Sequence, residues 1–140
     1  MPDTTPTEPD HVERRSPALL ALLVVVGLEF VALVVVTIVL IVELIVAPAT
    51  SIASGIALTV LAAIAALWLG SLCIGLRNRR PWVRSGIIVW QVLQGALAIG
   101  AFQGVFRVPA VGWFLLIPAL LGITLVLSRP VTDALARPVE

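Results

Sequence analysis

The chain has 140 residues, of which 60% are hydrophobic and only 12% are charged, and its formal net charge is +1. A soluble domain carries roughly 25% charged residues, because a globule of this size needs a polar surface, so the composition excludes an ordinary water-soluble fold and indicates a membrane protein. The small net charge offers no strong attraction to nucleic acid, and we expect no nucleic-acid partner.

The N-terminal residues 1–15 carry three prolines, four acidic residues and almost nothing apolar, so we expect a disordered cytoplasmic tail. Ser16 and Pro17 then favour the start of a helix. The apolar run from 17 to about 47 must be helical in lipid, where an unpaired strand edge is prohibitive. At about thirty residues it is about twice the length of a signal-peptide core, so we favour an uncleaved first span over a cleaved signal ending near Ala47-Pro48-Ala49.

Three further apolar segments predict a transmembrane domain over 16–130, with a short cytoplasmic C-terminal tail over 131–140. The expected spans are 52–76, 86–106 and 113–128. Pro118 lies inside the last of them, where a proline is expected to kink a helix. The sequence therefore predicts an all-α fold, a four-helix transmembrane bundle of two helical hairpins.

Small residues recur every fourth position along the second expected span, as Ala62, Ala66 and Gly70 do. A stripe of this kind lets a neighbouring helix approach closely. In the third expected span, Gly100 and Gly104 make a similar step. We expect these faces to pack against other helices, and a substrate groove is the minority interpretation.

A basic loop joins the two expected hairpins and contains no acidic residue; its arginines are Arg77, Arg79, Arg80 and Arg84. Positive residues beside spans mark the cytoplasmic side. Arg14, Arg15 and Arg129 fall on the same side as this loop, whereas Arg107 alone falls on the other. We therefore expect a multi-pass protein of the cell membrane with both termini in the cytoplasm and one insertion direction.

Trp82 lies within the arginine loop, at a position suited to the membrane interface. With Arg77, Arg79, Arg80 and Arg84 it forms a candidate contact for anionic lipid headgroups, at about 1 kcal/mol per charge. The setting of topology alone explains these arginines equally well.

Glu29 is the sharpest signal for a site inside the membrane. It lies thirteen residues beyond Ser16, which is about 20 Å along a helix and near mid-membrane. A carboxylate costs at least about 2.5 kcal/mol there, so it is either neutral or paired with donors. Glu43 shares its face of the helix but lies about 21 Å farther along, too far for a catalytic pair.

Gln91 and Gln94 are the best candidate donors to Glu29, because the spans contain no Lys, Arg or His. Matching depths from the loop favours a Glu29–Gln94 hydrogen bond, with Trp90 and Thr59 as further candidates. The first interpretation is a polar clasp that fixes helix register, at about 1 kcal/mol. Proton or cation coupling and assembly with an outside partner remain open.

Enzyme motifs are absent from the sequence: there is no Ser–His–Asp set, HExxH, metal-ligand spacing or phosphate-binding glycine loop. Cys73 is the single cysteine and lies in an apolar run, where a packing role is the ordinary one. We expect no catalytic residue, no cofactor and no metal.

The segments Arg80-Pro81-Trp82-Val83-Arg84-Ser85-Gly86 and Val89-Trp90-Gln91-Val92-Leu93-Gln94 resemble the uncharacterised small four-span integral membrane proteins of actinobacterial type. That resemblance implies the same architecture in a bacterial inner membrane, and no activity. Glu29 alone is similar to the first-span glutamate of the small multidrug resistance transporters. The chain departs from that family in having no tyrosine, a one-sided charge bias and a longer N-terminal tail.

We therefore expect a non-enzymatic accessory or structural membrane protein. Its partners would be the lipid bilayer and either a second copy of itself or a larger membrane complex. The alternative is a small proton-coupled secondary transporter that uses Glu29.

Overall fold

Five helices make up the computed structural model, which describes residues 16–46, 52–104 and 107–136. They are α1 (Pro17–Val46), α2 (Ile52–Arg77), α3 (Val83–Gln103), α4 (Pro109–Val126) and α5 (Arg129–Ala136). No strand occurs in this described part of the chain, which confirms the all-α prediction. The expected tail over 1–15 lies outside the described residues.

The first four helices are long and apolar enough to cross a membrane, so the protein is a multi-pass membrane protein. Their outward faces carry large apolar side chains in contact with the surroundings; Leu67 is 77% exposed and Phe114 is 82% exposed. Such a surface is stable in lipid and not in water. The composition and the exposed surface therefore both indicate that lipid surrounds these helices.

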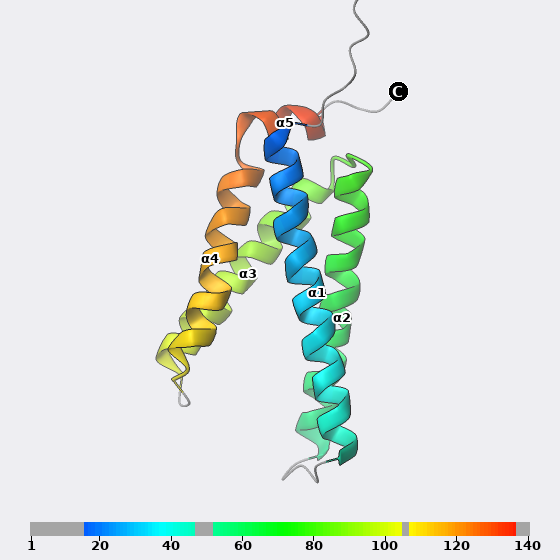
Figure 1. Ribbon diagram of the computed structural model, residues 1–140, viewed down its shortest axis with the longest axis vertical. Helices are drawn as coiled ribbons and strands as arrows, with labels where there is room; N and C mark the ends of the chain where they lie inside the picture. Colours follow the sequence, from blue (N-terminus) through cyan, green and yellow to red (C-terminus); the bar gives the residue numbers. More distant parts are fainter. Residues whose placement is uncertain (1–15, 47–51, 105–106, 137–140) are drawn as a thin grey trace, which may run out of the picture.

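The helices pair as two hairpins, α1 with α2 and α3 with α4, and each hairpin packs far more closely within itself than against the other (Figure 1). In the first hairpin, Ala62 and Ala66 are buried and Gly70 receives the ring of Phe30. In the second, Gly112 lies against the ring of Phe102. Small residues thus allow close helix approach within each hairpin, as the α2 pattern predicted.

The two hairpins meet at the end of the molecule that carries the α2–α3 turn and diverge toward the opposite end (Figure 1). Helix α3 runs obliquely behind α1 and α4 in this view. The main apolar core lies where the hairpins meet, and its fully buried members include Leu22, Leu69, Leu72, Ile87 and Val126. The contact between hairpins is therefore concentrated at one end of the bundle.

Helix α5 crosses the end of the bundle where the hairpins meet (Figure 1) and buries Val131 and Leu135 in the same core. The sequence predicted a short polar tail from residue 131, which did not include this helix. Val131 and Leu135 lie four residues apart and so share one face of a helix. That spacing was a signal for a packed amphipathic helix, which the overall polarity of the segment obscured.

The α2–α3 turn closes with a Schellman arrangement. The backbone N–H of Arg80 donates to the carbonyl of Gly75 at 2.9 Å, and that of Arg79 donates to Leu76 at 3.1 Å. Arg79 takes a left-handed conformation with φ 52°, at the position where glycine is usually found. The chain therefore accepts backbone strain to keep an arginine in this turn.

The helix ends differ from the expected spans by a few residues. Helix α3 begins at Val83 instead of 86, and α4 begins at Pro109 instead of 113, because a proline suits the first turn of a helix. Helix α4 also continues through Pro118 without a break.

Candidate functional site

Glu29 lies on the buried face of α1. Leu19, Leu22, Val26 and Glu29 follow one another at intervals of three and four residues and are all buried. Glu29 itself is 9% exposed. It is the only charged side chain among the buried residues that the structure describes, so the face that builds the core also places a carboxyl group inside it.

Two side chains of α3 donate hydrogen bonds to this carboxyl group. Trp90 Nε1 donates to Glu29 Oε2 at 3.1 Å. Gln91 Nε2 donates to Glu29 Oε1 at 3.3 Å and to Oε2 at 3.2 Å. Both donors are neutral, so they satisfy the carboxyl oxygens without supplying a counter-charge. They also link the first hairpin directly to the second.

Gln94 lies one turn farther along α3 and is 5% exposed. Its side-chain amide also lies near the carboxyl group of Glu29. The structure therefore brings together Glu29, Gln91 and Gln94, which the sequence had grouped. The donors that bind Glu29 are Gln91 and Trp90. The sequence analysis had favoured Gln94, because Gln94 and Glu29 lie at similar depths when residues are counted along the helices.

Thr59 is not part of this cluster. Its hydroxyl donates to the carbonyl of Gly55 in its own helix at 2.8 Å. Glu43, the other acid of α1, is exposed and lies toward the opposite end of the helix. These two sequence candidates therefore contribute nothing to the cluster around Glu29.

Helix α4 forms a further wall of the cluster through Gly122. A Cβ atom at Gly122 would overlap the Gln91 side chain, so Gln91 occupies space that only glycine leaves open. The sequence analysis did not single out Gly122, because its role depends on a helix distant in the sequence. The cluster thus rests on α1, α3 and α4 together.

Two oxygen atoms of the cluster are buried without a hydrogen-bond donor: Gln91 Oε1 and Gln94 Oε1. An unpaired buried acceptor costs about 1–3 kcal/mol. With the two carboxyl oxygens of Glu29, they make a group rich in acceptors and poor in donors. This imbalance is the most unusual chemical feature of the core.

Comparisons with known proteins add no relative to these observations. No protein-family model matches the chain, and comparisons with curated proteins and with solved structures give no match either. The functional argument therefore depends on the geometry of this chain alone.

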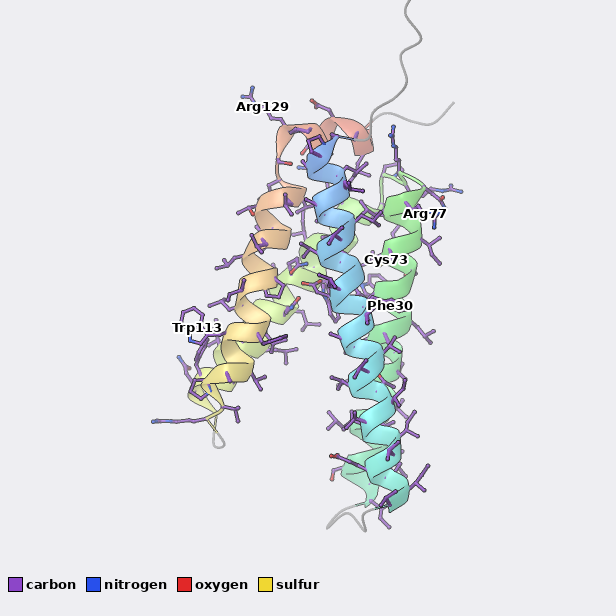
Figure 2. The ribbon with its side chains drawn as sticks, viewed as in Figure 1. Phe30, Cys73, Arg77, Trp113 and Arg129 are labelled. Carbon is purple, nitrogen blue, oxygen red and sulfur yellow. The ribbon has the colours of Figure 1, made fainter. Side chains whose placement is uncertain are left out.

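The arginine loop lies at the end of the molecule where the hairpins meet. Figure 2 shows Arg77 and Arg129 at this end and Trp113 near the other. Arg77 and Arg79 line a small open hollow together with leucines of α1 and α2; these are Leu19, Leu20, Leu23 and Leu76. A positive rim beside apolar side chains suits the junction of a phosphate headgroup and an acyl chain.

The other members of the candidate lipid contact are placed differently. Arg80 is exposed, and Trp82 is 49% exposed. Arg84 is partly buried at the start of α3, and its Nε has no hydrogen-bond partner. Arg80 and Trp82 are thus accessible to headgroups, whereas Arg84 lies deeper.

Cys73 is a free thiol, partly buried and packed against the apolar core from α2. Within the described ranges, no group of three or more His, Cys, Asp or Glu side chains is placed to hold a metal ion. Cys73 therefore acts as a packing residue in this arrangement.

Proposed function

We propose that this protein is a non-enzymatic accessory or structural component of a bacterial cell membrane. In this proposal, the cluster of Glu29, Trp90 and Gln91 is a clasp that holds its two hairpins at a fixed angle. The observation that carries the proposal is the set of hydrogen bonds from Trp90 and Gln91 to Glu29, because it joins the hairpins inside the bilayer.

The need for a clasp follows from the packing. The hairpins contact each other weakly compared with the packing inside each hairpin, and their ends diverge (Figure 1). In lipid, apolar contact between helices gains little over contact with acyl chains, so hydrogen bonds between helices carry more of the specificity. A fixed angle between hairpins would present defined apolar faces to another membrane protein or to a second copy.

The orientation belongs to the same proposal. The arginine loop and both termini would lie in the cytoplasm, because Arg77, Arg79, Arg80, Arg84 and Arg129 gather at one end of the helices. The exposed members of this group would contact anionic headgroups of the inner leaflet. The strained conformation of Arg79 supports a role for its charge, since glycine would relieve the strain.

Purification in a mild detergent, followed by mass measurement of the intact complex, tests the accessory role. We expect the wild-type chain to retain a stoichiometric partner or a second copy, and Glu29→Leu to lose it as the hairpins loosen. Glu43→Leu is the matched control, because Glu43 is exposed and outside the cluster. A wild-type chain that is always a partner-free monomer would contradict the proposal.

A small proton-coupled secondary transporter is the second candidate, and one observation favours it. Glu29 is the one buried acid in the described part of the chain and joins the two hairpins through Trp90 and Gln91, so loading or unloading it would alter their angle. Liposomes with an imposed pH gradient and cationic dyes test this candidate. Transport that is lost in Glu29→Gln, while the fold persists, would replace the accessory role.

A further inference from the structure

When its carboxyl group is ionised, Glu29 carries a charge that the side chains hydrogen-bonded to it do not balance. In α1 to α4, the basic side chains are Arg77 at the end of α2 and Arg84 at the start of α3, and the hydrogen bonds to Glu29 come from the neutral side chains of Trp90 and Gln91. A buried charge without a counter-charge is costly in a low-dielectric environment. The group that completes the cluster is therefore expected to carry positive charge.

The two unpaired oxygens point to the same kind of group. Gln91 is fully buried and Gln94 is 5% exposed, yet Oε1 of each has no donor. Carboxylate and carboxamide oxygens are the preferred ligands of hard cations. Two buried carboxamide oxygens that lack donors, on the helix whose Gln91 Nε2 contacts a carboxyl group, supply the side-chain chemistry of an alkali-cation site once the carboxamides turn.

We propose that Glu29, Gln91 and Gln94 bind one small monovalent metal cation, with Na⁺ as the probe, between α1 and α3. A single carboxylate and a monovalent ion cancel in charge, whereas a divalent ion would leave one positive charge inside the membrane. This site goes beyond the clasp, and an accessory protein and a transporter are each compatible with it.

The size of the ion follows from the packing. Gln91 fills the space beside Gly122, and the one hollow described above lies at the arginine loop, away from Glu29. The burial of Gln91 and Gln94 and the close contact of Gln91 with α4 favour a small metal ion over an organic ammonium ion, and the metal ion must enter with most of its hydration shell removed. Half a turn of each carboxamide exchanges Nε2 for Oε1 beside the carboxyl group, without a backbone change.

In the ion-bound arrangement, one carboxyl oxygen of Glu29 and Oε1 of Gln91 and of Gln94 face the cation. Trp90 keeps its hydrogen bond to the carboxyl group, because its indole N–H competes for no amide oxygen. Gln91 then exchanges its hydrogen bonds to Glu29 for ion contacts. The clasp thus persists in both arrangements through different atoms.

Binding of radioactive Na⁺ to the purified full-length chain tests the proposal, with choline as the inert replacement cation at constant pH and ionic strength. We expect saturable binding of one ion per chain and a higher unfolding temperature in NaCl than in choline chloride. Gln94→Met should weaken the affinity by about tenfold or more, which corresponds to the loss of one ligand.

Gln94→Met is preferred to Glu29→Gln as the test variant, because Glu29→Gln also changes the hydrogen bonds that join the two hairpins. Methionine matches glutamine in length and removes both the unpartnered oxygen and the amide that faces Glu29, so the unfolding temperature of this variant in choline is its own baseline, and the rise that NaCl adds to that baseline should be lost. Glu43→Gln is the control and should bind Na⁺ like the wild type. The accessory proposal is judged by co-purification instead, so the two can fail separately.

Three results would overturn the cation site. The first is the absence of saturable Na⁺ binding to the wild-type chain. The second is Na⁺ binding that Gln94→Met leaves unchanged. The third is an unfolding temperature that follows pH alone and is equal in NaCl and choline chloride, which would assign the balancing charge to a proton.

Discussion

Gln91 on α3 donates its side-chain N–H₂ group to both carboxyl oxygens of Glu29 on α1, at 3.3 and 3.2 Å, across 62 positions of sequence. This contact lies where the two hairpins meet and is joined by Trp90 from the same helix. It adds a polar connection from α3 to the packing of α1 against α4, although most of the packing of α3 is with α4. The relative position of the hairpins therefore depends on these polar atoms as well as on the apolar core where the hairpins meet.

The indole donor of Trp90 can be removed without removing the ring. Trp90→Phe should lower the free energy of unfolding by about 1 kcal/mol, because one hydrogen bond between helices is lost inside the membrane. Unfolding in lipid or mixed micelles measures the change. Trp113→Phe is the control: its ring packs edge-on against Phe102 with centroids 5.5 Å apart, and a Phe ring preserves that contact. Equal losses in the two variants would contradict the role of the Trp90 N–H.

The space beside Gly122 gives a second prediction. Gly122→Ala should destabilise the fold by about 1–3 kcal/mol, because the added methyl group overlaps Gln91 and pushes it off Glu29. Gly100→Ala adds the same methyl group to α3 at a position with nothing within 4 Å. It should be neutral, or stabilise by up to about 1 kcal/mol through helix propensity. Urea or dodecyl sulfate unfolding distinguishes the two, and a neutral Gly122→Ala would mean that Gln91 is not confined by α4.

The packing of α5 gives a third prediction. Leu135→Ala should cost about 2–5 kcal/mol, because Leu135 is 2% exposed and lies in the core that joins the hairpins. Leu127→Ala changes the same side chain at a position that is 55% exposed and should have little effect. Thermal unfolding of both variants is the measurement. A free, unpacked tail would leave Leu135→Ala as stable as the wild type.

The proposed orientation gives a fourth prediction, which is best tested with single cysteines in a Cys73→Ser background. Asn78→Cys lies in the α2–α3 turn, and Val108→Cys lies just before α4 at the other end of the bundle. A membrane-impermeant thiol reagent should label Val108→Cys in intact cells, and Asn78→Cys only after permeabilisation. The reverse pattern would place the arginine loop outside the cell.

The fold was largely predictable from hydrophobic length and turn residues. Four apolar runs separated by short polar turns leave little choice in lipid, where each run must be a helix. The α5 helix was missed for a physical reason. Its eight residues lie outside the apolar runs, and the burial of Val131 and Leu135 depends on a core built by α1 to α4.

The sequence predicted which residues form the polar cluster, but it did not predict which of them donate hydrogen bonds to Glu29. Glu29 and the glutamines of α3 are rare polar groups in apolar spans, so grouping them needed no structure. The favoured partner was Gln94, because counting residues from the loop assumes that both helices run parallel to the membrane normal. Helix α3 runs obliquely, which brings Trp90 and Gln91 to Glu29 instead (Figure 1). Tilt is set by packing, which span lengths do not encode.

A double-mutant cycle between Glu29→Leu and Gln91→Leu, measured by unfolding in lipid, tests the central claim most directly. The clasp predicts a coupling free energy of about 0.6–2 kcal/mol, because each single variant already removes the shared hydrogen bonds. The same cycle between Glu43→Leu and Gln91→Leu should give a value close to zero. Additive effects of Glu29→Leu and Gln91→Leu, with no coupling, would show that these two residues do not hold the hairpins together.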